Sequence, residues 1–147
     1  MGEKHYLKVP GEYSKIQSVC GFVAEGARRS GLDESSVFHV ELACDEACSN
    51  IIEHGYGGEG EGEIRVSWQL DDDLFRVTIH DHGRPFKPDD VEEPTISMVE
   101  GSDIAEKQIK VGGFGIHFMR KLMDEVHFQF NQEMGNTLTM VKRIPKK

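Results

Sequence analysis

Two stretches of alternating apolar residues lie close together near the middle of the chain, at 63–70 (EIRVSWQL) and 74–81 (LFRVTIHD). Alternation with a period of two is the pattern of a strand that buries one face. The residues between the two stretches, Asp71-Asp72-Asp73, are typical of a turn. We therefore predict a β-hairpin, and the fold of this chain must contain antiparallel strands.

The other elements follow from the same kind of periodicity. Gly31 and Gly55 are placed to end two helices, and Met134-Gly135 to form a turn. The predicted elements are a strand around 5–9, helices at 14–30 and 33–54, a third helix at 114–126, and a closing hairpin of 127–132 with 136–144. This order predicts an α+β fold, a two-layer α/β sandwich with helices on one face of a mixed, mostly antiparallel sheet. We expect residues 1–147 to form a single domain.

Composition excludes several classes of function. The net charge of −9 argues against non-specific binding to nucleic acid or to an anionic membrane, because phosphate groups would be repelled. The chain has three cysteines, an odd number, which predicts reduced thiols and a cytoplasmic protein. No apolar run approaches the length that would span a membrane.

A row of oxygen-bearing side chains lies on the second predicted helix. Glu46, Asn50 and Glu53 share one face, and no Lys or Arg occurs between Arg29 and Arg65. Most such rows are solvated helix faces. A row without neutralising cations also suits a cation from outside, and carboxylate and amide oxygens suit Mg²⁺ shared with phosphate oxygens.

Two further patterns match that second interpretation. Gly112, Gly113 and Gly115 lie at the start of the third predicted helix, where free N–H groups favour a phosphate, although glycines before a helix also form ordinary turns. Asp81 closes a strand, and Gly83 permits a sharp exit from it. A carboxylate there can accept a hydrogen bond from an exocyclic amine such as that of adenine, or it can simply stabilise an Asp-x-Gly turn.

Together these motifs resemble those of the GHKL (Bergerat) ATPase superfamily, which includes gyrase and histidine kinases. The N box is ELACDEACSNIIEHGYG, the two glycine boxes are DHGRPF and GGFGIHFMRKLMDEV, and the last box is GNTLTMVKR. Within the superfamily, the segments NIIEHGYG and LMDEV are most similar to anti-sigma-factor serine kinases of the RsbW and SpoIIAB type. The resemblance covers about residues 12–142.

The resemblance implies a role for each matching residue. Glu46 would polarise the attacking hydroxyl and Asn50 would hold Mg²⁺. Asp81 would recognise the adenine amine, with Gly83 letting the base lie close and Thr137 assisting. The implied ATP- or ADP-binding residues are Asn50, Asp81, Gly83, Lys110, Gly112, Gly113, Phe114, Gly115 and Thr137.

Residues 84–112 contain three of the five prolines and little periodicity, which predicts a long, functional loop. By resemblance, 87–111 would be a lid over the nucleotide. Its sequence lacks arginine between Arg84 and Arg120, and Lys107 or Lys110 would have to contact the phosphates instead.

The resemblance also implies partners. The chain would bind a sigma factor and phosphorylate a serine of an anti-anti-sigma protein with a STAS-type fold, and it would form a homodimer. Two alternatives remain at this point. One is a non-catalytic binding module whose affinity for a partner changes with ATP or ADP, and the other is a structural protein that uses no nucleotide.

Overall fold

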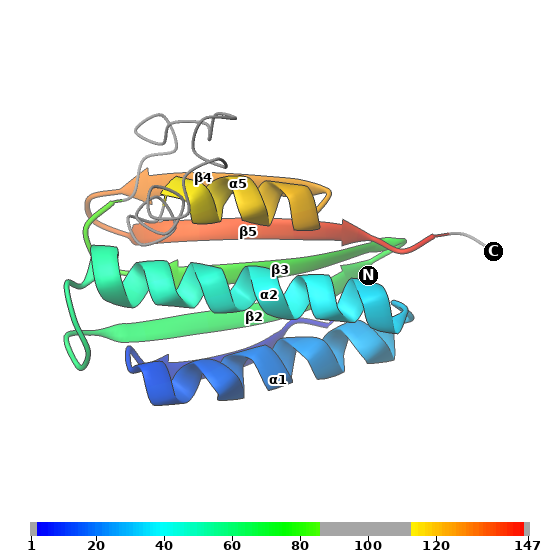
Figure 1. Ribbon diagram of the computed structural model, residues 1–147, viewed down its shortest axis with the longest axis horizontal. Coiled ribbons are helices and arrows are strands. Elements are labelled where there is room, and N and C mark those ends of the chain that lie inside the picture. Colours follow the sequence, from blue (N-terminus) through cyan, green and yellow to red (C-terminus); the bar gives the residue numbers. More distant parts are fainter. Residues whose placement is uncertain (1–2, 86–112, 146–147) are drawn as a thin grey trace, which may run out of the picture.

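The computed structural model describes residues 3–85 and 113–145 (Figure 1). Most of the predicted loop of 84–112 and the whole of the expected lid of 87–111 lie outside these residues. In chain order the elements are β1 (His5–Pro10), α1 (Tyr13–Ser30), α2 (Glu34–Asn50), the π-helical turn η1 (Ile51–Gly55), β2 (Glu63–Asp71), β3 (Leu74–Asp81), α5 (Gly113–Leu122), β4 (Glu125–Asn131) and β5 (Gly135–Arg143).

The strands form one sheet in the order β1-β2-β3-β5-β4, and each of these neighbouring pairs is antiparallel. The predicted central hairpin is β2 with β3, and the predicted closing hairpin is β4 with β5. Helices α1, α2 and α5 lie along one face of the sheet (Figure 1). The predicted α+β sandwich is therefore confirmed. None of the described helices is both long and apolar enough to cross a membrane.

Helix α2 begins and ends as its sequence indicates, apart from its last turn. The Asp33 carboxylate accepts a hydrogen bond from the N–H of Ser36 at 2.8 Å and so caps the helix. After Asn50 the chain continues as the wider turn η1, which ends at Gly55. Ile52 lies four residues after Cys48, and its side chain is fully buried. Ile51 is partly buried against the core and also borders a pocket.

The core lies between the helices and the sheet. Cys44 and Cys48 are fully buried there as free thiols, and burial raises the pKa of both. The largest fully buried side chains are Phe75, Ile52, Ile64, Ile79, Ile116, Met119 and Met140.

The third helix is shorter than predicted. We expected it to reach residue 126, but α5 ends at Leu122 and β4 begins at Glu125. Two contacts with β5 explain this early end. The Lys142 ammonium donates a hydrogen bond to the carbonyl oxygen of Leu122 at 2.5 Å, and the N–H of Asp124 donates to the carbonyl oxygen of Val141 at 2.8 Å. Tertiary contacts thus override the helical periodicity of this segment.

Helix α1 packs closely on Trp68 of β2 at Gly26. A Cβ atom at Gly26 would lie 2.3 Å from Cε2 of the Trp68 indole, closer than any real contact. The His5 ring stacks on the indole with ring centroids 4.1 Å apart. The Arg29 guanidinium lies 5.7 Å from the centroid of the indole. The absence of a side chain at Gly26 is what lets α1 pack on this indole.

Two glycines of α1 should therefore respond oppositely to alanine. We expect Gly26→Ala to lower the free energy of unfolding by about 1–3 kcal/mol, because the new methyl group overlaps the indole. A Cβ at Gly21 meets no atom within 4 Å, so Gly21→Ala should raise it by about 0.5–1 kcal/mol through helix propensity. Urea denaturation of both variants measures the difference. Equal effects at the two sites would contradict this account of the packing.

Candidate functional site

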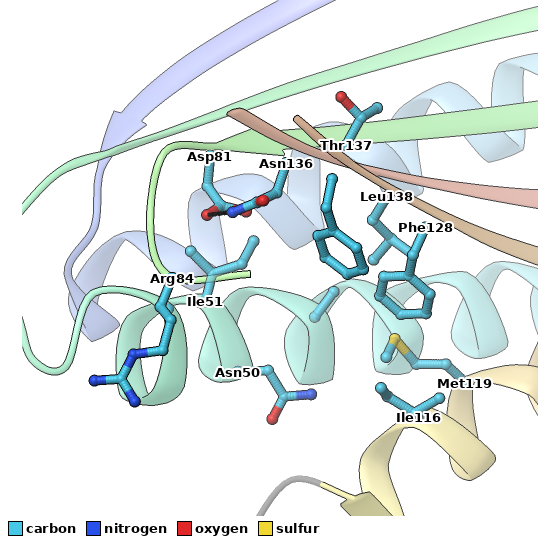
Figure 2. Close-up of a pocket in the computed structure, with 13 residues that line it drawn as sticks. Asn50, Ile51, Asp81, Arg84, Ile116, Met119, Phe128, Asn136, Thr137 and Leu138 are labelled. Atoms are coloured by element: carbon cyan, nitrogen blue, oxygen red, sulfur yellow. Dashed lines mark hydrogen bonds between the residues drawn. The ribbon is translucent and has the colours of Figure 1, made fainter. Parts of the chain in front are cut away.

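A pocket opens between α2, α5 and the neighbouring ends of the strands β3, β4 and β5 (Figure 2). It encloses about 470 Å³, its open mouth included. Most of its wall is apolar and its polar groups are few, which is the usual character of a site for a small molecule. The lining residues are Ala47, Asn50, Ile51, Gly55, Asp81, Arg84, Ile116, Met119, Phe128, Phe130, Asn136, Thr137 and Leu138.

Asp81 forms the polar floor of this pocket. It is the last residue of β3, on the inward face of the strand, and only 6% of it is exposed. Its Oδ1 accepts hydrogen bonds from the N–H of Gly83 at 2.8 Å and from Nδ2 of Asn136 at 3.1 Å. A buried carboxylate with bonds to neutral donors is a strong acceptor for a further donor from a ligand.

Gly83 lets the turn after β3 pack against the end of the second helix. A Cβ atom at Gly83 would lie 2.6 Å from the carbonyl carbon of Gly55. In the same contact, the N–H of Arg84 donates to the carbonyl oxygen of Gly55 at 2.7 Å. We expected Gly83 to make room for a base. In the structure the backbone of Gly55 lies against Gly83, and the expected contact with a base stays a prediction.

Tyr56 also holds the turn after β3 in place. Its hydroxyl donates to the carbonyl oxygen of Glu63 at 2.6 Å and accepts from the N–H of His82 at 3.0 Å. A Cβ at Gly62 would lie 2.3 Å from the Tyr56 ring, so the glycine-rich loop closes directly over this ring. No sequence pattern indicates this role for Tyr56, because it depends on contacts with residues that are distant along the chain.

Glu46 and Asn50 lie one turn apart on α2, as predicted. Asn50 lines the pocket, whereas Glu46 lies one turn before it and is not among the lining residues. Partial burial raises the pKa of the Glu46 carboxyl above its usual value, and the negative charges of Asp45 and Glu53 raise it further.

The first turn of α5 borders the pocket. Gly113 and Gly115 belong to this turn, and the side chains of Ile116 and Met119 form the adjoining wall (Figure 2). The first N–H groups of a helix have no partner within the helix and favour an anion. Three predicted nucleotide contacts lie outside what the structure describes, namely Lys110, Gly112 and the side chain of Phe114.

Thr137 borders the pocket, but its hydroxyl faces the other side of the sheet. Its Oγ1 lies 3.1 Å from Nδ1 of His80, and Figure 2 shows the side chain directed away from Asp81. The register of β3 and β5 explains this, since Thr137 pairs with His80 and Asn136 pairs with Asp81. The inward residue next to Asp81 is thus Asn136, which the sequence analysis missed by one position.

These groups suit a flat ligand that carries an amine at one end and negative charge at the other. The apolar walls would hold a ring, Asp81 would accept from the amine, and the α5 terminus would face the anion. For a metal, the nearby donors are the amide oxygen of Asn50 and the carboxylate of Glu46. Among the described residues no three His, Cys, Asp or Glu side chains converge on one point. One amide oxygen and one carboxylate fit Mg²⁺, which is commonly held by few protein oxygens together with water and phosphate.

Comparisons with known proteins agree with this description. A family model of the histidine kinase-like ATPase domain matches residues 9–142. The serine-protein kinase RsbW of Bacillus velezensis is 29% identical over 138 residues, which cover 94% of this chain and 84% of the relative. RsbW of Listeria innocua is 29% identical over 121 residues, which cover 82% of this chain and 74% of the relative.

Solved structures match in fold. The structure of the RsbU and RsbW domains of a Mycobacterium tuberculosis protein aligns with a TM-score of 0.68 at 18% identity and covers 99% of this chain. This chain spans 33% of that longer chain. The catalytic domain of the histidine kinase ThkA aligns with a TM-score of 0.54 at 15% identity, covering 97% of this chain and 99% of that one. The family model and the relatives confirm the resemblance drawn from the sequence motifs, and the solved structures agree in fold.

The contact between Gly83 and Gly55 predicts that alanine at these two positions has unequal effects on the free energy of unfolding. Gly83→Ala should lower the free energy of unfolding by about 1–3 kcal/mol, because its methyl group would overlap backbone atoms that cannot move aside. A Cβ at Gly55 would have its nearest neighbour at 3.7 Å, so we expect Gly55→Ala to be tolerated far better. Thermal and urea denaturation of the two variants test this difference, and similar losses in both would contradict it.

Proposed function

The chain belongs to the family of histidine kinase-like ATPase domains, and on that basis we propose that it is an ATP- and Mg²⁺-dependent serine protein kinase that also acts as an anti-sigma factor. The observation that carries the proposal is the pocket in which the buried carboxylate of Asp81, the amide of Asn50 and the first turn of α5 meet. The relatives named serine-protein kinase support the reaction type.

In this proposal the adenine ring lies between the apolar walls formed by Ile51, Ile116 and Leu138. Its exocyclic amine donates a hydrogen bond to Asp81. The phosphates extend toward the backbone N–H groups of Gly113 and Gly115, with Lys110, Gly112 and Phe114 completing the contacts and residues 87–111 closing over the nucleotide.

Asn50 would hold the metal ion through its amide oxygen. Bound Mg²⁺ supplies positive charge that neutralises the phosphate oxygens during transfer. Arg84 borders the mouth of the same pocket and offers the bidentate guanidinium that the sequence of the lid lacks. We propose that Arg84 supports phosphate binding from the mouth.

Glu46 would act as the general base. The serine hydroxyl of the protein substrate gives its proton to this carboxylate, the serine oxygen bonds to the γ-phosphorus, and the bond to the leaving ADP breaks. The raised pKa of Glu46 suits this role, since a more basic carboxylate accepts a proton more readily.

The resemblance extends the proposal to partners and location. The substrate would be a serine of an anti-anti-sigma protein with a STAS-type fold, and its phosphorylation would leave the sigma factor bound to the kinase. The protein would act in the cytoplasm as a homodimer, without contacting nucleic acid or membrane. A second candidate function is a binding module that holds ATP or ADP without transferring phosphate. The lack of arginine between Arg84 and Arg120 favours this second candidate.

Nucleotide binding should stabilise the fold. At about one hundred times Kd, ADP with Mg²⁺ should add roughly 2.7 kcal/mol to the free energy of unfolding. Differential scanning fluorimetry with and without ADP-Mg²⁺ measures this stabilisation. A folded protein whose melting temperature stays unchanged at millimolar nucleotide would exclude both candidate functions.

Removal of the base should separate binding from transfer. We expect Glu46→Gln to bind ATP as the unmodified protein does and to phosphorylate a purified STAS-type protein at least about one hundred times more slowly. Labelled ATP measures transfer and calorimetry measures binding. Glu41→Gln, on the same helix, is the matched control and should transfer normally. Normal transfer by Glu46→Gln would refute the assigned base, and no transfer by any protein would favour the binding module.

The transfer rate should depend on pH through Glu46. Only the ionised carboxylate can accept the proton, so the rate should fall as pH drops through the raised pKa of Glu46. Asp45 has the largest effect among the negative charges that raise this pKa, and Asp45→Asn removes its charge. The acidic limb of the pH–rate profile should then move to lower pH. A limb that stays in place or moves upward would contradict this electrostatic account.

A further inference from the structure

Asn136 holds the carboxylate at the floor of the pocket. It lies on β5 directly opposite Asp81, and only 7% of it is exposed. Its Nδ2 donates one hydrogen bond to Oδ1 of Asp81 at 3.1 Å and another to the carbonyl oxygen of Gly83 at 2.8 Å. Asn136 thereby joins the end of β3, the turn that follows it and the start of β5 (Figure 2).

The orientation of this amide is determined by its neighbours. If the amide group were turned over, its oxygen would face two other oxygens, those of Asp81 and Gly83, and both hydrogen bonds would be lost. Both hydrogens of Nδ2 are therefore used within the protein. Oδ1 of Asn136 is the atom left for a ligand, and it is an acceptor.

Asp81 presents an acceptor to the pocket as well. Its Oδ1 already accepts from Gly83 and Asn136. Within residues 3–85 and 113–145 no hydrogen bond reaches its Oδ2. The hydroxyl of Thr137, which would have been a donor, contacts His80 on the opposite face. Among the described residues, Asp81 and Asn136 thus offer acceptors and no free side-chain donor at the floor of the pocket.

We propose that Asn136 is a positioning and specificity-determining residue, which fixes Asp81 and makes the floor of the pocket select a purine by its amino group alone. The inference rests on the proposed nucleotide binding and extends it. A purine amine can donate to this floor. The ring nitrogen beside the amine, N1, is an acceptor and finds no donor among the described residues of the floor, so we expect only water to contact it.

Two ADP analogues test what the floor recognises. Purine riboside diphosphate lacks the amine, and we expect it to bind at least about tenfold more weakly than ADP, the loss of one hydrogen bond to a charged group. In 1-deaza-ADP a C–H group replaces N1, and we expect it to bind within about threefold of ADP, because only a water contact is lost. Isothermal calorimetry with Mg²⁺ gives the three values of Kd.

The outcomes separate this inference from the function on which it rests. If 1-deaza-ADP loses as much affinity as the analogue without the amine, a protein donor contacts N1 and the inference is wrong. If ADP itself does not bind to the folded protein, the proposed function is overturned and the inference falls with it.

A substitution tests Asn136 directly. We expect Asn136→Leu to weaken ADP binding at least about tenfold, since Asp81 loses a fixed donor. The ratio between the Kd of the amine-free analogue and that of ADP should also fall at least about threefold. If Asn136 had a merely structural role, its replacement would weaken the binding of both ligands equally and leave this ratio unchanged. That result would overturn the inference.

Two further variants complete the experiment. Thr139→Val alters β5 on the face away from the pocket and should keep both Kd values and their ratio. Asn136→Ser retains one donor and should give a ratio between those of the unmodified protein and Asn136→Leu. If the leucine variant does not fold, the serine variant decides, because a ratio equal to that of the unmodified protein would still refute the proposal.

Discussion

The close approach of two backbones, at Gly83 and Gly55, is the contact on which the candidate site depends. It joins the sheet to the helix layer at the point where β3 and the second helix both end. The hydrogen bond from the N–H of Arg84 to the carbonyl oxygen of Gly55 holds the turn against the helix, and the carboxylate of Asp81 and the amide of Asn50 line one pocket. Tyr56 and Asn136 hold the same corner through hydrogen bonds to His82 and to Gly83. The site is therefore built from backbone packing first, and its polar side chains follow.

Local periodicity was enough to predict most of the fold. The alternation of burial holds along the whole of β3 and along β2 from Glu63 to Val66, after which Ser67 on the opposite face of β2 is buried as well. The helical pattern after residue 122 was misleading, because contacts of Lys142 and Val141 end α5 before that pattern does. Periodicity describes one segment at a time, and it cannot register where another strand ends a helix.

The same limit explains which site residues the sequence could identify. Asn50 could be identified by its face of the second helix, and Asp81 by its position at the end of a strand. The structure brings both residues to the pocket. Asn136 and Thr137 are neighbours on one strand, and only the register with β3 decides which of them faces Asp81. A shift of one residue reverses the face, so register is the information that a single segment lacks.

The packing of α1 over Trp68 has a practical consequence. Trp68 is the one tryptophan of the chain, it is almost fully buried, and it does not line the pocket. Its intrinsic fluorescence should therefore follow the separation of the helix layer from the sheet and should respond little to a bound base. The protein thus carries a built-in optical reporter of its tertiary structure, which needs no attached dye.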